Sequence, residues 1–334
     1  MHLPSPADIW DLPKDCVVAP LDHGGYNNHL FRVDVSGTAT HVLRVYGNHS
    51  NPRLIEHELA VVLQLQRQKL PFAVPAPEFT LRGEMCATVS TPDGIKLMVL
   101  LPFLRGVNPT PSNLGQARAI GSAIAQLLNA MKRVDTRGLR LPPSYLMLER
   151  VHPLVPEPLR AMDELGTLAN KTTRFQINDI LERVTADANG AWRALGAQLT
   201  HGDVIPGNIL TEGERVSAIL DFENCASNPR AMDLAGALDT WLWDVLGDAD
   251  ALWRRYDAVG AGFSSVIRLS RDEIAALPML ILLRNASVLM HLIGRFTSGL
   301  SPYIDVENWL ETMIQLDEWL TENNEEMRAR AAQW

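Results

Sequence analysis

Apolar residues recur at every third or fourth position through most of the C-terminal two-thirds of the chain, a spacing that lines one face of a helix. The capping-box sequence from Ser270 to Glu273 predicts a helix that begins there and runs through Ala276. The apolar periodicity predicts further helices over residues 114–131, 176–195, 232–246 and 277–296. The spacing of the tryptophans in this region favours packing between helices over a ligand cage: Trp241, Trp243, Trp253, Trp309 and Trp319.

The N-terminal third has a different pattern. Apolar side chains alternate along residues 31–35, as in a half-buried strand, and residues 41–46 are expected to form the next strand. A further strand pair is expected around Met85 and over residues 95–101. Residues 56–65 carry apolar side chains at helical spacing. This part of the chain therefore predicts a sheet accompanied by one helix.

Length and composition limit the classes of protein to consider. A chain of 334 residues exceeds what one hydrophobic core usually holds, and 46% hydrophobic residues are enough to fill two lobes. Cys16, Cys86 and Cys225 lie far apart without a CxxC pair, which argues against a zinc site and against a disulfide framework. The net charge of −9, without a Lys/Arg-rich block, disfavours nucleic acid as a partner. Without a leader sequence or an uninterrupted run of 18 apolar residues, we expect a cytoplasmic protein that does not enter a membrane.

Three oxygen-bearing side chains have the spacing that phosphoryl transfer uses. Asp203 precedes Asn208 by five residues, and Asp221 follows on a second apolar segment. A protein-kinase catalytic loop has its base Asp and a metal-binding Asn at this spacing, and a second metal-binding Asp on a nearby strand. Residues 208–210 and 216–220 flank a polar turn with a glycine, which predicts a hairpin that returns Asp221 to Asn208. Such residues also cluster in ordinary turns, but their order and spacing together favour a kinase.

The chemistry of the reaction explains these residue types. A transferring phosphoryl group carries diffuse negative charge, so a kinase supplies metal ions at the β/γ-oxygens and a carboxylate at the acceptor hydroxyl. Asp203 is the candidate carboxylate. Asn208 and Asp221 offer the hard oxygen ligands that Mg²⁺ accepts, few in number because the ion keeps waters and takes phosphate oxygens. We therefore predict ATP and Mg²⁺ as cofactors.

The segments HGDVIPGN, LDFE and RAMDLA, which begin at His201, Leu220 and Arg230, resemble those of the aminoglycoside phosphotransferase and choline kinase superfamily. Homoserine and methylthioribose kinases belong to the same superfamily. The resemblance implies an α+β, two-lobed, protein-kinase-like fold. An N-terminal antiparallel sheet with one helix would form the nucleotide-binding lobe over residues 1–102. A mainly helical lobe over residues 103–334 would carry the catalytic and substrate-binding residues.

The resemblance also implies a role for each residue of the catalytic segment. Asp203 corresponds to the catalytic base of the family, and Asn208 and Asp221 correspond to its metal ligands. Asp233 corresponds to a buried carboxylate that braces the catalytic loop. His201 corresponds to a structural member of that loop.

A glycine pair near the N-terminus resembles the GGxxN turn of the family. Gly24 and Gly25 precede Asn28 at the family's spacing. Adjacent glycines let backbone N–H groups approach phosphate oxygens closely, so the resemblance implies that this turn contacts the nucleotide. A Gly-Gly pair before a strand is also typical of a simple hairpin turn, and this alternative stays open.

Arg44 occupies the strand position where the family commonly has a lysine that contacts the α/β-phosphates. Arginine keeps the positive charge and can hold oxygens through two N–H groups, although its geometry differs from that of lysine. A solvated strand residue is the alternative. The helix glutamate that pairs with this cation in the family corresponds to Glu58, with Glu56 as the rival. Either glutamate could instead face solvent near a helix N-terminus.

Residues 102–106 resemble the hinge between the lobes in this family. Such a hinge binds adenine through one backbone carbonyl and, two residues later, one backbone N–H. Pro102 lacks an N–H but keeps its carbonyl, and Leu104 keeps its N–H, so both are compatible with nucleotide binding. A plain linker between domains is the competing interpretation.

The acceptor is expected to be a small molecule with a hydroxyl group. Loosely spaced residues from Asp233 to Arg284 resemble the homoserine kinase branch more than the antibiotic-modifying branch. An amino acid acceptor needs a cation for its carboxylate, and Arg284 or Arg295 could provide it or could pair with acidic neighbours. The acidic residues from 301 to 334 either steer an ammonium-bearing substrate or form solvated helix faces.

We therefore predict phosphorylation of homoserine or a related amino alcohol. Aminoglycoside, choline-like and sugar acceptors are alternatives within the same class. A catalytically silent pseudokinase that binds nucleotide is the alternative from a different class. The sequence leaves the oligomeric state open.

Overall fold

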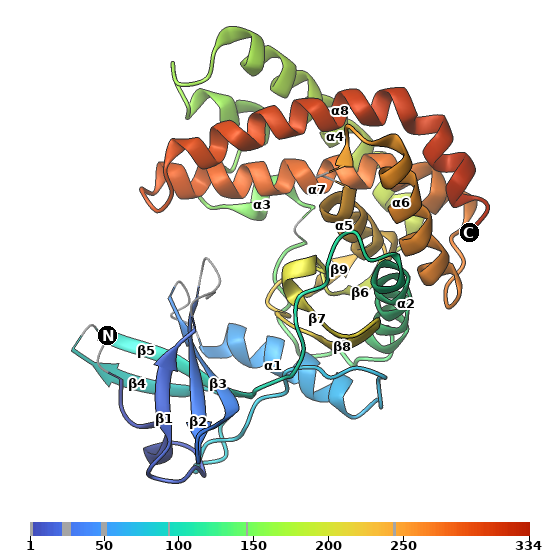
Figure 1. Ribbon diagram of the computed structural model, residues 1–334. Coiled ribbons are helices and arrows are strands. Elements are labelled where there is room, and N and C mark those ends of the chain that lie inside the picture. Colours follow the sequence, from blue (N-terminus) through green and yellow to red (C-terminus); the bar gives the residue numbers. More distant parts are fainter. Residues whose placement is uncertain (1–2, 22–27, 48–51, 93, 145, 243–244) are drawn as a thin grey trace.

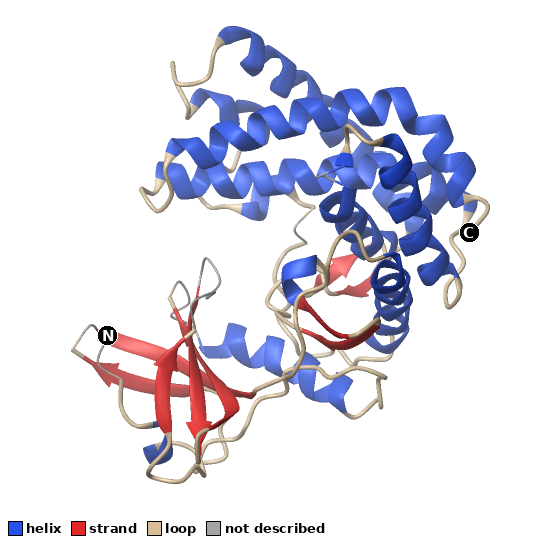
Figure 2. Ribbon diagram, viewed as in Figure 1, coloured by secondary structure: helices blue, strands red, loops and turns tan. Residues whose placement is uncertain are grey.

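The protein has two lobes, a smaller one built on a sheet and a larger one that is mainly helical (Figures 1 and 2). This arrangement confirms the predicted α+β, two-lobed architecture. The computed structural model describes residues 3–21, 28–47, 52–92, 94–144, 146–242 and 245–334.

The N-terminal sheet has five antiparallel strands in the order β1-β2-β3-β5-β4. Their bounds are β1 (Val17–Pro20), β2 (Asn28–Val35), β3 (Thr38–Tyr46), β4 (Ala87–Thr91) and β5 (Gly94–Pro102). The expected strand pair is present, but β4 begins at Ala87, just past Met85. Among the described residues of this lobe there is one α-helix, α1 (Pro52–Gln66), and a short 3-10 turn, η1 (Pro6–Asp8), precedes the sheet.

The apolar run of β5 is buried because both faces of the sheet are covered. Met98 and Leu100 pack with Trp10 on one face, in a cluster that also holds residues of β2 and β3. Leu97 and Val99 point to the opposite face and join a cluster with side chains of α1. A strand that packs on both faces has a nearly continuous apolar sequence, as β5 does.

α1 runs from the sheet towards the larger lobe and contributes to both cores (Figure 1). Its Val61, Val62 and Leu65 belong to the main core of the C-terminal lobe. β5 ends at Pro102, and we propose that the boundary between the two lobes lies there, between residues 1–102 and 103–334. Their apolar cores are nevertheless joined through α1.

The C-terminal lobe holds seven helices within the residues that the structure describes. They are α2 (Leu114–Met131), α3 (Leu148–Val151), α4 (Lys171–Leu195), α5 (Ala231–Leu242), α6 (Ala249–Ser264), α7 (Arg271–Thr297) and α8 (Tyr303–Ala331). Two 3-10 turns, η2 (Pro158–Asp163) and η3 (Pro206–Asn208), lie between them. The short strands β6 (Gln198–Thr200) and β9 (Ala226–Asn228) pair with each other, as do β7 (Ile209–Glu212) and β8 (Arg215–Ile219).

Most predicted helices of this lobe are present with shifted ends. α2 has the predicted bounds, whereas α4 begins earlier, at a cap in which the Asn170 side chain accepts from the N–H of Thr173. The capping box at Ser270 is formed. The helix that it opens continues through Pro278 to Thr297, so the two segments expected there are one helix, α7. Burial of the apolar residues along α7 outweighs the hydrogen bond that Pro278 removes.

α7 is the central helix of the larger lobe and packs against α3, α4, α5 and α8. By length and composition α7 could cross a membrane, with a mean hydropathy of 1.7 over an 18-residue segment. However, 78% of this 18-residue segment is buried inside the protein. The described tryptophans are packing residues, as expected: Trp241 is fully buried, and the rings of Trp253 and Trp319 lie 5.5 Å apart. Trp243 lies outside the described residues.

Candidate active site

The predicted catalytic loop follows β6, and a side chain of α5 binds its backbone. The buried carboxylate of Asp233 accepts hydrogen bonds from the backbone N–H groups of His201 (2.9 Å) and Gly202 (2.8 Å). Gly202 has a φ of +83°, and a Cβ atom there would lie 2.5 Å from the carbonyl oxygen of Asn224. Only glycine fits this position without moving the backbone. Asp233 therefore lies where the sequence placed it, against the backbone of the loop.

Asp203 follows Gly202 in this loop, and both of its carboxylate oxygens accept hydrogen bonds. Nδ2 of Asn208 donates to Oδ2 of Asp203 (3.1 Å) and to its backbone carbonyl (3.0 Å). Nη2 of Arg284 donates to the other oxygen, Oδ1, over 2.7 Å. The carboxylate therefore has a fixed orientation, with 18% of the side chain exposed.

The β7–β8 hairpin brings Asp221 back to the loop, as predicted. The backbone N–H of Leu220 donates to the carbonyl of Asn208 (2.8 Å), so the residue before Asp221 is bonded to Asn208. His201 accepts from the N–H of Asp203 at Nδ1 (3.2 Å), which leaves the proton on Nε2 for the carbonyl of Leu220 (3.0 Å). His201 therefore joins the two segments of the site through hydrogen bonds.

Arg44 connects the two lobes. Its Nη1 donates to Oε1 of Glu58 on α1 (3.0 Å), and its Nη2 donates to Oδ1 of Asp221 (2.6 Å). The Arg44 side chain is only 9% exposed, so it is not a solvated strand residue. Glu58, and not its rival Glu56, is the residue that pairs with Arg44. The hydroxyl of Tyr46 donates to the second oxygen of Glu58 (3.3 Å), a contact that the sequence did not predict.

Burial dominates the electrostatics of this pair. It raises the pKa of Glu58 to about 7, with Arg44 acting in the opposite direction. Burial also opposes the charge of Arg44, but the nearby Asp221 and Glu58 raise its pKa well above the ordinary value. Arg44 is therefore a permanent cation beside two carboxyl groups.

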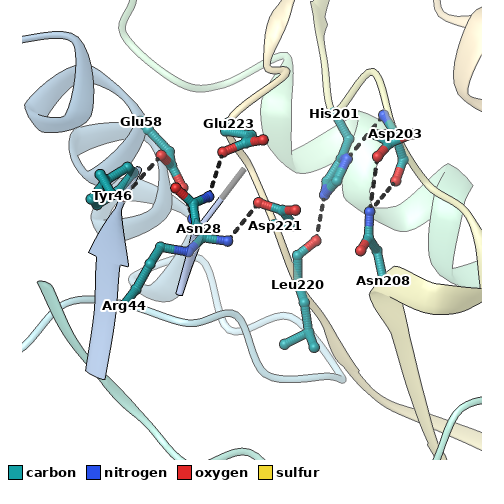
Figure 3. A network of polar contacts seen from close by, with 10 residues as sticks. All are labelled: Asn28, Arg44, Tyr46, Glu58, His201, Asp203, Asn208, Leu220, Asp221 and Glu223. Carbon is teal, nitrogen blue, oxygen red and sulfur yellow. Dashed lines mark hydrogen bonds and ion pairs between the residues drawn. The ribbon is translucent and has the colours of Figure 1, made fainter. Parts of the chain in front are cut away.

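A second contact between the lobes lies beside the first. Nδ2 of Asn28, at the start of β2, donates to Oε2 of Glu223 over 3.0 Å (Figure 3). Glu223 was not singled out from the sequence, although it follows Asp221 by two residues in the same LDFE segment. Gly24 and Gly25 lie outside the described residues, and Asn28 is the residue of the predicted GGxxN turn whose contact is described.

The segment from Pro102 to Val107 passes from the N-terminal sheet to the β7–β8 hairpin. Pro102 ends β5 opposite His41 of β3, and Leu104 lies half-buried just beyond. The carbonyl of Arg105 accepts from Oγ of Ser217, and Val107 exchanges backbone hydrogen bonds with Thr211. The segment is therefore fixed against the hairpin that carries the candidate metal ligands.

Asn208 and Asp221 have the donor atoms that a magnesium ion requires. Asn208 uses its Nδ2 for Asp203, so its amide oxygen is the atom it offers to a cation. Among the described residues, no group of three or more His, Cys, Asp and Glu side chains is arranged to hold a metal. Two oxygen donors on adjoining segments suit Mg²⁺, which keeps waters and binds substrate phosphates.

α7 contributes side chains next to Asp203. Arg284 contacts Asp203, and His291 lies within electrostatic range of both. Burial, together with Arg295, lowers the pKa of His291 to about 4, so this imidazole is neutral at physiological pH. Arg295 is used elsewhere: its Nε donates to Oγ of Ser301 (2.9 Å) near the end of the helix. Of the two arginines proposed from the sequence, Arg284 is the one that contacts Asp203.

Comparisons with known proteins identify similar sequences and structures. A model of the phosphotransferase enzyme family matches residues 18–266. Homoserine kinase from Beijerinckia indica is 30% identical over 272 residues, covering 81% of this chain and 78% of that protein. A microcompartment-associated aminopropanol kinase has a similar structure, with a TM-score of 0.72 and 17% identity over 94% of this chain and 95% of that one. Amicoumacin kinase, solved in complex with AMP-PNP and Ca²⁺, has a TM-score of 0.66 at 13% identity, over 91% and 89% of the two chains.

Proposed function

The chain belongs to the phosphotransferase enzyme family and is a small-molecule kinase with an alcohol group as acceptor, and we propose that it transfers the γ-phosphoryl group of ATP to homoserine. The fold is protein-kinase-like, as the structural neighbours show. The observation that carries the proposal is the Asp203 carboxylate, held on a braced loop next to Asn208 and the hairpin of Asp221.

ATP would bind between the lobes. In this proposal Arg44, held by Glu58, contacts the α/β-phosphates, and the carbonyl of Pro102 and the N–H of Leu104 bind the adenine. Gly24, Gly25 and Asn28 would close over the phosphates. The structural neighbour with bound AMP-PNP supports an adenine nucleotide as the phosphoryl donor.

Mg²⁺ would be held by Asn208 and Asp221. When bound, it neutralises charge on the β- and γ-phosphate oxygens. Asp203 would accept a hydrogen bond from the acceptor hydroxyl, orient it towards the phosphoryl group and take its proton during transfer. His201 and Asp233 keep the backbone of this loop in place and have no direct part in the reaction.

Homoserine as the acceptor is supported by the charge of α7 as well as by the relatives. Arg284 gives this side of the site positive charge, and Arg295 lies near enough to help keep His291 neutral. A carboxylate-bearing amino alcohol suits such a surface. A polycationic aminoglycoside or a quaternary ammonium group would require acidic or aromatic groups there.

The experiment that tests the proposal is a measurement of ADP release with MgATP and a panel of acceptors. The panel contains homoserine, serine, threonine, 1-amino-2-propanol, choline and an aminoglycoside. The proposal requires the highest kcat/KM for homoserine. If another acceptor is phosphorylated and homoserine is not, that acceptor replaces homoserine as the proposed substrate. Nucleotide binding without phosphorylation of any acceptor would identify a pseudokinase.

A further inference from the structure

No lysine or arginine lies between Asp203, the proposed base, and Asn208 in the sequence of the predicted catalytic loop. Between Asp203 and Asn208 the chain contains only Val204, Ile205, Pro206 and Gly207, none of which carries a charge. The cation comes instead from α7, where Arg284 donates to Oδ1 of Asp203 over 2.7 Å from 81 residues further along the chain.

Arg284 is held in this position by the packing of α7 against α5. Gly236 of α5 lies beside the guanidinium: a Cβ atom there would be in ordinary van der Waals contact, 3.9 Å from Nε of Arg284. Asp239, one turn further along α5, is buried and accepts from Nδ2 of Asn285 over 2.5 Å. Burial raises the pKa of Asp239 to about 7, and Arg284 acts in the opposite direction. Arg284 therefore interacts with carboxyl groups of both the loop and α5.

The N-terminal end of α7 is also fixed to the rest of the site. Arg230, which directly precedes α5, donates to both carboxylate oxygens of Glu273, over 2.6 and 2.9 Å. Asp233, which braces the catalytic loop, lies in the first turn of α5. The loop backbone and the Asp203 carboxylate are thus held by two helices that are anchored to each other.

The orientation of Asp203 matters for the rate of transfer. Asn208 bonds to Oδ2 and Arg284 bonds to Oδ1, which leaves the carboxylate no freedom to rotate. A carboxylate oxygen has two lone pairs, so either oxygen can still accept from an acceptor hydroxyl. In positioned reactions a displacement of about 1 Å can cost about 10²-fold in rate.

We propose that Arg284 is a positioning residue for phosphoryl transfer, which orients the Asp203 carboxylate towards the acceptor hydroxyl. The inference rests on the proposed role of Asp203 as the base. If Arg284 acts through Asp203, its removal lowers kcat and leaves the binding of ATP in place. If it only stabilises the packing of α7, its removal lowers the melting temperature and leaves the kcat of the folded enzyme unchanged.

The test compares Arg284→Met, Arg284→Lys, Asp203→Asn and the Asp203→Asn/Arg284→Met double variant in the full chain with MgATP and homoserine. Arg284→Met is expected to lower kcat by about 10- to 100-fold, within the range for loss of positioning, with the KM for ATP nearly unchanged. Arg284→Lys keeps the charge and should recover part of this loss. In the Asp203→Asn background, Arg284→Met should add almost no further loss, because the two residues act through one contact.

A matched control separates this role from the general effect of losing a buried arginine. Arg255 of α6 is also buried, and its Nη1 donates to the carbonyl of Trp241 over 3.2 Å. Arg255→Met should lower the melting temperature and leave kcat unchanged. Losses that multiply in the Asp203→Asn/Arg284→Met variant, or an unchanged kcat in Arg284→Met, would overturn the inference.

Failure of the proposed acceptor is distinguishable from failure of the inference. If the wild type does not phosphorylate homoserine, the acceptor assignment fails. The same variants are then compared with the acceptor found in the panel or, without one, by ATP hydrolysis, in which water is the acceptor. If no reaction depends on Asp203, the base assignment is wrong and the role of Arg284 is refuted with it.

Discussion

Replacement of Glu58 by glutamine should raise the unfolding free energy at alkaline pH and weaken the binding of MgATP. The glutamate side chain is 10% exposed, and its oxygens accept from Arg44 and from the hydroxyl of Tyr46. Glutamine has nearly the same shape, and its amide oxygen can accept from Arg44 while its NH₂ group donates to Tyr46. Glu58→Gln therefore removes the charge and the titration with little change in packing.

The magnitude follows from the pKa of Glu58, which burial raises from 4.5 to about 7. Because the folded protein holds this proton more tightly than the unfolded chain, the stabilisation is complete below pH 4.5 and is lost as the pH rises through about 7. At about 1.36 kcal/mol per pKa unit, the loss is about 3 kcal/mol. Glu58→Gln does not titrate, so it should gain about 2–3 kcal/mol of unfolding free energy relative to the wild type between pH 5 and pH 8.

Urea denaturation of both proteins at pH 5 and pH 8 measures this difference. Glu56→Gln is the matched control, because it removes one carboxylate from the same helix without touching Arg44. The reasoning is refuted if the difference in unfolding free energy between Glu58→Gln and the wild type is the same at both pH values. A parallel titration with MgATP should show weaker binding to Glu58→Gln, since Arg44 loses its charged partner on α1.

Three further changes test the catalytic segment. Asp203→Asn should lower kcat by at least ~10²-fold and leave the affinity for ATP largely intact. If steady-state kinetics give the wild-type kcat, Asp203 is not the catalytic base. Asp221→Ala should weaken nucleotide binding only when Mg²⁺ is present, so equal calorimetric titrations with and without Mg²⁺ would contradict its role as a ligand. Gly202→Ala, at a φ of +83° and 2.5 Å from the Asn224 carbonyl, should cost at least about 1–3 kcal/mol; an unchanged melting temperature would show that the loop adapts.

The parts of the site that the sequence predicted are those determined locally. Asp203 and Asn208 are five residues apart, and a short turn joins β7 to β8, so spacing alone indicates that these groups meet. The contact between Leu220 and Asn208 is a direct product of that hairpin. α2 was also predicted with its observed bounds, because its apolar face repeats without interruption.

The parts that the sequence did not predict depend on how the elements pack. Glu56 and Glu58 lie on the same helix, and only the orientation of α1 against β3 decides which of them meets Arg44. The bond between Asn28 and Glu223 joins residues 195 positions apart, and no local pattern links them. The apolar pattern predicted two separate helical segments around Pro278, but the burial of α7 on several sides keeps one continuous helix.

The two proposed functional aspartates share a feature that links stability to catalysis. Asp221 is paired with Arg44 from the N-terminal sheet, and Asp203 is paired with Arg284 from α7, so each carboxylate is held by a cation from outside the catalytic hairpin. Each arginine also interacts with a second, buried carboxyl group, Glu58 or Asp239, whose pKa burial raises to about 7. Buried ion pairs of this kind contribute little to stability, but removal of an arginine would leave two carboxyl groups without their cation. The arrangement therefore favours fixed positions for Asp203 and Asp221 over maximal stability, which is why the variants above should separate rate from unfolding free energy.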